Sequence, residues 1–109
     1  MLAASEAFER AIAMDGALGN GWLGRGLCRI RRGEVDAGLQ DLAAAAALEP
    51  QRSLLRSYLG KAFANAGDAE HAAQELVLAR RLDDQDPTPW LYAALLNQEQ
   101  SRIDRKSVV

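Results

Sequence analysis

GEVDAGLQDL at residues 33–42 is followed, 34 positions later, by GDAEHAAQEL at residues 67–76. The two stretches keep their small and apolar positions, whereas their charged positions change. The same shift places Gly26 on Gly60, outside the quoted stretches. A repeat of this length is typical of helical repeat arrays, in which each unit buries its apolar face against its neighbours.

Apolar residues within each period recur at intervals of three and four, as Val35, Leu39 and Leu42 do. This spacing places them on one stripe of a helix. The pattern predicts an all-α fold with about six amphipathic helices and no strand. We expect these helices at residues 2–14, 19–32, 35–48, 53–66, 69–82 and 88–100.

Glycines and prolines separate the predicted helices. Gly33 and Gly67 follow apolar periodic runs, and a glycine at such a place ends a helix in the left-handed conformation. Asp68 can then cap the helix that follows. Pro50 and Pro87 mark the longer turns, because proline is tolerated in a first helical turn but not in a helix interior.

Two further glycines fall in the middle of predicted helices. Gly26 and Gly60 each cost about 1 kcal/mol relative to alanine there. We expect them to make room for large side chains of the partner helix, Leu42 and Leu76. Each such buried leucine contributes roughly 1.5 to 3 kcal/mol, which offsets the cost of the glycine.

At these positions the chain resembles the tetratricopeptide repeat, a unit of 34 residues that reads W-x2-L-G-x2-Y, then A-x3-F, then P. No single repeat shows every mark. The marks that do occur are Trp22 and Trp90, Leu59-Gly60 followed by Phe63, Ala4 with Phe8, Gly38 with Leu42, Ala72 with Leu76, and Pro50. Arg29, Asp84 and Lys106 depart from the pattern.

The resemblance implies antiparallel helix pairs stacked as a right-handed α-solenoid, in a single domain over residues 1–109. Residues 19–52 and 53–86 are then complete repeats, and residues 2–14 and 87–100 are half repeats. Residues 101–109 are expected to be a tail or a truncated helix. The resemblance also indicates an excerpt from a longer bacterial array.

By the same resemblance, the first helix of each pair lines a concave groove that binds a partner. The residues expected there are Asn20, Leu23, Leu27, Ile30, Arg31, Leu54, Ser57, Tyr58, Lys61, Asn65, Thr88, Leu91, Tyr92, Leu95 and Glu99. This largely apolar set is suited to an amphipathic helix or an extended apolar segment. The carboxylate clamp of some family members is not expected. For Leu27 and Leu95, packing against adjacent helices is an equally weighted alternative.

Arg25, Arg29 and Arg32 form a basic stripe, which is open to two interpretations. It can recruit an acidic peptide or a phosphate. The favoured interpretation is a solvated face that exchanges weak salt bridges with acids such as Glu34, Asp36 and Asp41.

The remaining residues with reactive or metal-binding side chains do not indicate catalysis, a cofactor site or a metal site. The chain has one cysteine, Cys28, and one histidine, His71, so a disulfide framework and a Cys/His metal cluster are excluded. We expect Cys28 to be a small buried residue and His71 to be exposed. The acids at residues 83–86 are interpreted as solvated turn residues, with Asp86 helping to start the next helix.

Composition excludes further classes of partner. The net charge is −2, and no basic face continues across the repeats, so nucleic-acid binding is not expected. No apolar run approaches the roughly 18 to 20 residues needed to cross a bilayer, so membrane insertion is not expected. We therefore expect a soluble chain, with its localisation left open between cytoplasm and periplasm.

The sequence thus predicts a non-enzymatic interaction scaffold that binds a peptide or helix of a protein partner in an apolar groove. One alternative is self-association, because the half repeats at the two ends complement each other. Another is a docking domain of a larger chain, including one that carries an enzyme.

Overall fold

Six α-helices form a row of packed pairs in the computed structural model, which describes residues 2–14, 16 and 19–107. The helices are α1 (Leu2–Met14), α2 (Gly19–Arg31), α3 (Val35–Leu48), α4 (Ser53–Asn65), α5 (Ala69–Leu82) and α6 (Thr88–Ser107). No strand occurs in these described ranges. The chain therefore has the all-α helical repeat fold that its periodicity predicts.

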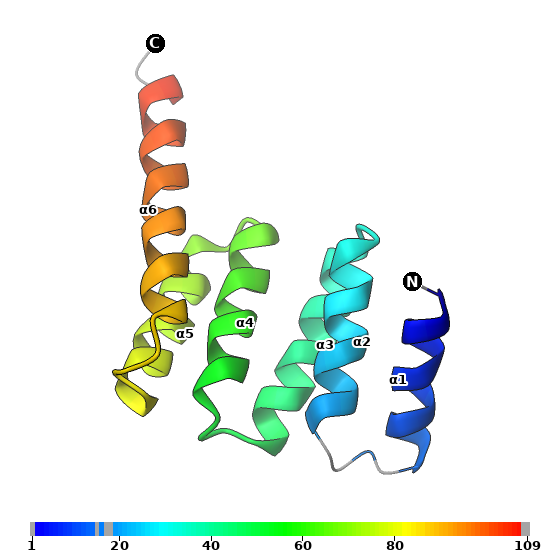
Figure 1. The fold of residues 1–109 in the computed structure, drawn as a ribbon. Helices are drawn as coiled ribbons and strands as arrows, with labels where there is room; N and C mark the ends of the chain where they lie inside the picture. The colour runs from blue at the N-terminus through cyan, green and yellow to red at the C-terminus, as the bar shows by residue number, and fades with distance from the viewer. Residues whose placement is uncertain (1, 15, 17–18, 108–109) are drawn as a thin grey trace.

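The helices stack in chain order (Figure 1). The two closest associations are α2 with α3 and α4 with α5, which are the predicted pairs. Helix α3 also contacts α4, α1 contacts α2, and α6 contacts both α4 and α5. The result is an elongated body of 52 × 30 × 18 Å in which each helix touches mainly its neighbours along the row.

Both predicted helix-ending glycines adopt the left-handed conformation, with φ of 87° at Gly33 and 84° at Gly67. After Gly33, the backbone N–H of Glu34 reaches back to the carbonyl of Arg29 at 2.8 Å. The equivalent bond after Gly67 joins Asp68 to Phe63 at 2.9 Å. These bonds satisfy carbonyls at the end of each helix and turn the chain sharply into the next one.

The prediction that the last helix ends near residue 100 was wrong. Helix α6 continues without a break to Ser107, and its end projects beyond the other helices (Figure 1). Ser101 stands 34 positions after Gly67, where the repeat would place its turn glycine. A serine adopts a left-handed conformation much less readily than glycine, so the helix does not stop. The other predicted bounds differ from the structure by at most one residue.

The main core lies between α3 and α4, where it joins the two helix pairs. Leu42 and Ala46 of α3 pack there with Leu59 and Ala62 of α4, and all are at most 4% exposed. Partly buried side chains surround this cluster: Leu23, Leu27, Ile30, Leu39, Tyr58 and Phe63. Side chains from α2, α3 and α4 thus share one apolar cluster.

The mid-helix glycines have the packing role that the sequence predicted. A Cβ added at Gly26 would lie 3.1 Å from Cγ of Leu42, and one added at Gly60 would lie 2.9 Å from Cγ of Leu76. Both leucines are 1% exposed. The glycines therefore allow each leucine of a second helix to reach the backbone of the first helix.

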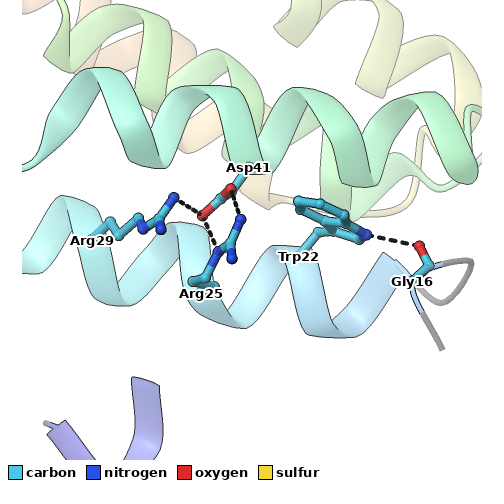
Figure 2. Close-up of polar contacts among 5 residues, drawn as sticks. All are labelled: Gly16, Trp22, Arg25, Arg29 and Asp41. Carbon is cyan, nitrogen blue, oxygen red and sulfur yellow. Dashed lines mark hydrogen bonds and ion pairs between the residues drawn. The ribbon is translucent and has the colours of Figure 1, made fainter. Parts of the chain in front are cut away.

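The basic stripe on α2 is less exposed than the sequence indicated. Asp41 of α3 is 3% exposed and lies between two arginines of α2 (Figure 2). Arg25 donates to it from Nε at 2.9 Å and from Nη2 at 2.8 Å, and Arg29 donates from Nη1 at 3.1 Å. This hydrogen bonding to Asp41 raises the pKa of Arg25. Two of the three arginines thus join α2 to α3, whereas Arg32 pairs with the exposed Glu34 at 2.9 Å.

Asp68 caps α5, and the cap makes a pH-dependent contribution to stability. Its carboxylate accepts a hydrogen bond from the backbone N–H of His71 at 3.1 Å, and His71 Nδ1 lies 2.6 Å from the other carboxylate oxygen. The backbone bond is the main cause that lowers the pKa of Asp68. Because the folded pKa lies below that of the unfolded chain, the contribution is present at neutral pH and is lost as the pH falls through the lowered pKa.

We therefore expect the Asp68 carboxyl carbon to titrate at lower pH in the folded protein than in the urea-unfolded chain, as followed by NMR. Asp68→Asn keeps an acceptor for the backbone N–H and should retain α5 helicity at acidic pH. Equal titration midpoints in the folded and unfolded chains would contradict the capping role.

Candidate functional site

An open cleft of about 640 Å³ lies between α4, α5 and α6. Tyr92, Leu95 and Leu96 of α6, Ala64 of α4 and Leu76 of α5 form the apolar part of its lining. On α6 these side chains follow helical spacing, which places them on one face. Most of the other lining residues are polar or charged, so the cleft offers a ligand both apolar contact and polar groups.

Aromatic rings form one side of this region. The ring centroids of Tyr58 and Tyr92 are 6.5 Å apart at an interplanar angle of 45°. Nζ of Lys61 lies 5.9 Å from the centroid of the Tyr92 ring. Burial, and then the proximity of Tyr58, raise the pKa of Tyr92 above its ordinary value. The tyrosine is therefore neutral at physiological pH and contributes both apolar surface and a hydroxyl group.

Cations outnumber acids in the cleft lining. Lys61, Arg102 and Arg105 contribute three positive charges, against one negative charge from Glu99. Glu99 and Arg102 form an ion pair at 2.5 Å, which lowers the pKa of Glu99 and raises that of Arg102. The salt bridges found in the described part of the chain involve neither Lys61 nor Arg105. The cleft therefore presents positive charge to a ligand.

Five of the predicted groove residues line this cleft: Lys61, Asn65, Tyr92, Leu95 and Glu99. Tyr58 adjoins it through its contact with Tyr92. Leu95, for which packing was the alternative, is 43% exposed. These six predicted residues of α4 and α6 thus lie at one surface.

The predicted residues on α2 are placed differently. Leu23, Leu27 and Ile30 pack against the core cluster, and Leu27 also faces α1. Asn20 accepts a hydrogen bond from Nη1 of Arg52 at 2.6 Å. Arg31 lies in a smaller cleft of about 250 Å³ between α1 and α2. These residues do not extend the cleft formed by α4 and α6.

The prediction that Ser57 lines the groove was wrong. It is fully buried, at 0% exposure, and cannot present its side chain to a partner. Among the described residues, its hydroxyl has no hydrogen-bond partner. Leu54 and Thr88 are half-buried, and Leu91 is 58% exposed, but none of the three lines the cleft.

Arg102 and Arg105 are cleft residues that sequence reasoning missed, because they lie beyond the predicted end of the last helix. Leu96 was missed for a different reason, since it is not a groove position in the repeat pattern. A signal for Arg102 was present, because Tyr92, Leu95, Glu99 and Arg102 continue one helical face at intervals of three and four.

The other chemistry-bearing residues have structural roles. Cys28 is buried, as predicted, and His71 is exposed and stacks on Phe63 with centroids 5.2 Å apart. Asp86 accepts a hydrogen bond from the backbone N–H of Thr88 at 2.9 Å, at the start of α6. Within the described ranges, no group of three or more His, Cys, Asp or Glu side chains is placed to hold a metal ion.

No helix in the described part of the chain is both long and apolar enough to cross a membrane.

Comparison with known proteins finds relatives in structure only. No protein-family model and no curated protein sequence matches the chain. One similar structure is the Yersinia enterocolitica type III secretion chaperone SycD, which was solved with a peptide of the translocator YopD. The TM-score is 0.73 at 18% sequence identity, and the match covers 94% of this chain and 79% of the SycD chain. PcrH, solved with the chaperone-binding region of PopD, gives a TM-score of 0.70 and 19% identity over 94% of this chain and 77% of PcrH.

At these identities the likeness shows the fold alone. It supports the assignment of the chain to the all-α helical repeat fold, with a TPR-like arrangement of helices.

Proposed function

We propose that this chain is a non-catalytic binding module that accepts a short segment of a protein partner in the cleft between α4 and α6. The observation that carries the proposal is the convergence of Tyr92 and Leu95 with Lys61 and Arg102 on one open surface that combines apolar and charged side chains. Support comes from two structures of similar fold, SycD and PcrH, which were solved with a peptide of YopD and a region of PopD, respectively.

The lining defines the chemistry of the partner segment. Apolar side chains of the segment would pack against Tyr92, Leu95 and Leu96, where each buried methylene contributes about 0.8 kcal/mol. Acidic side chains would lie near Lys61 and Arg105, which improves the rate of encounter and the specificity. The expected partner segment therefore combines apolar and acidic residues.

A displayed random-peptide library, selected against the chain, provides the test. Selected peptides should be enriched in apolar and acidic residues. Tyr92→Ala should weaken their binding by about tenfold or more, because aromatic side chains dominate the energetics of such sites. Leu95→Ala should weaken binding less, by about fivefold, because it removes a smaller contact. Fluorescence anisotropy of labelled peptides measures both effects.

Leu91→Ala is the matched control, because Leu91 is an exposed leucine of the same helix that does not line the cleft. Circular dichroism should show unchanged helicity in all three variants. If Tyr92→Ala unfolds the chain, Leu95→Ala still decides the outcome. The proposal fails if no peptide is selected, or if Leu91→Ala and Leu95→Ala weaken binding equally.

A further inference from the structure

The cleft residues that α6 contributes change in character along the helix. Aromatic and apolar residues come first, and charged residues follow: Tyr92, Leu95 and Leu96, then Glu99, Arg102 and Arg105. Because α6 is one continuous helix to Ser107, this order in the sequence is also an order along the helix axis (Figure 1). The other walls of the cleft belong to α4 and α5. The cleft thus lies between helices of the chain and has an apolar end and a charged end.

Lys61 of α4 belongs to the apolar end. Its Nζ lies 5.9 Å from the centroid of the Tyr92 ring, where the charge is attracted to the face of the ring. In the repeat it is equivalent to Leu95, which stands 34 positions later. The positive charge of the other end therefore comes from α6.

The two arginines of the charged end differ in their partners. Arg102 is paired with Glu99 at 2.5 Å, so most of its charge is neutralised within the chain. Arg105 is exposed, and its Nε donates a long hydrogen bond of 3.4 Å to the backbone oxygen of Ser101. Among the described residues no ion pair engages Arg105. Its terminal nitrogens are therefore available to an anionic group of a ligand.

The distance between the two ends limits the ligand. Arg105 stands nine residues after Leu96, which is about 14 Å along a helix. Its side chain turns back toward Ser101, one turn earlier, so the guanidinium lies roughly 8 to 14 Å beyond Leu96. An extended segment covers this span with about three or four residues. A helix about 10 Å wide and 14 Å long would occupy roughly 1,100 Å³, which exceeds the cleft volume of about 640 Å³.

We infer that the cleft selects an extended segment whose acidic side chain lies about three or four residues from its apolar anchor, with the acid bound by Arg105. This selectivity rests on the proposed function, because it specifies the segment that the same cleft accepts. Glu99 restricts the choice further, since its carboxylate occupies Arg102 and repels an acid placed between the two ends.

An array of synthetic peptides tests the spacing with the full chain. Each peptide carries a phenylalanine-leucine anchor and one glutamate in a serine background, with the glutamate at each separation from one to nine residues on either side. Binding should be strongest at about three or four residues, and on one side of the anchor, because an extended segment reaches Arg105 in one direction. A maximum beside the anchor would indicate Lys61, and one six or more residues away would indicate a helical segment. Either result, or no dependence on spacing, overturns the inference.

Substitutions in the chain test the assignment of the acid. Arg105→Gln should weaken the strongest array peptide about fivefold, as for an exposed charge-assisted pair, and should not affect the same peptide with glutamine in place of glutamate. Glu99→Gln should strengthen binding of the acidic peptide about threefold, because it frees Arg102 and removes a like charge. Fluorescence anisotropy measures these changes. Arg81→Gln is the matched control, an exposed arginine of α5 outside the cleft, with an expected change below about twofold.

Failure of this selectivity can be distinguished from failure of the proposed function. If neither Tyr92→Ala nor Leu95→Ala weakens any bound peptide, the cleft is not the binding site and both fail. If these variants weaken binding while Arg105→Gln and Arg81→Gln have equal effects, the cleft binds a segment but Arg105 does not select its acid. The same conclusion follows if library peptides bind through Tyr92 and no array peptide binds. Circular dichroism should show unchanged helicity for the substitutions at Arg105, Glu99 and Arg81, since all three are exposed.

Discussion

Replacing Gly60 with leucine is expected to destabilise the protein by about 3 kcal/mol, because it overpacks the contact between α4 and α5. A Cβ at this position already lies 2.9 Å from Cγ of Leu76 and 3.2 Å from the backbone oxygen of Ala72. The remaining atoms of a leucine therefore force the two helices apart. Small domains have a total stability of only about 5 to 15 kcal/mol, so the loss is a large fraction.

Urea unfolding followed by circular dichroism measures this effect. Gly60→Ala should lower the free energy of unfolding much less, because alanine favours the helix by about 1 kcal/mol over glycine and this gain offsets part of the clash. Ala73→Leu, at an exposed position of α5, is the control and should be nearly neutral. Leu76→Ala alone should cost about 2 to 5 kcal/mol, but combined with Gly60→Leu its cost should be smaller. Additive effects of the two substitutions would contradict direct contact between these positions.

Asp41→Ala is expected to cost about 2 to 3 kcal/mol of unfolding free energy, because it leaves two arginines facing each other without their shared acid. Arg25 and Arg29 have side chains only 19% and 25% exposed, so water compensates them incompletely. Their mutual repulsion adds to the loss. The estimate lies below that for a fully buried pair because both guanidinium groups retain some access to solvent.

Thermal and urea unfolding at two salt concentrations measure this loss. Asp36→Ala, an exposed acid on the same helix, is the control and should be nearly neutral. Replacing all three residues with apolar ones, as Arg25→Met, Arg29→Met and Asp41→Leu, should recover much of the stability, because no unpaired charge then remains. If Asp41→Ala unfolds at the same urea concentration as Asp36→Ala, the ion pair contributes nothing to stability.

Much of the fold was predictable because the controlling interactions are local or repeat themselves. The positions of Gly33 and Gly67 predict turns since only glycine adopts their left-handed backbone easily. Leu42 and Leu76 lie 34 residues apart, as Gly26 and Gly60 do, which predicts two equivalent packing sites. The structure confirms both. Ser101 is the sequence signal for the greater length of α6, because serine adopts the left-handed conformation less readily than glycine and the helix continues.

The candidate site was only partly predictable. Repeat position indicated Tyr92 and Leu95, which line the cleft, and it also indicated Ser57, which is fully buried. A repeat position specifies the face of a helix, whereas exposure depends on which neighbouring helix covers that face. The continuation of helix α6 also adds Arg102 and Arg105 to the cleft lining.

The sequence by itself determined the period, the helix pairs and the turns, because backbone preference and apolar spacing act within a few residues. Only the tertiary structure decided which exposed positions form a surface and which charges are shared. Asp41 shows the difference: its residue type and spacing resemble those of an exposed helix acid, yet packing of α3 against α2 buries it between two arginines. Burial is a property of the assembled helices, and it sets both the strength of that ion pair and the place where the cleft opens.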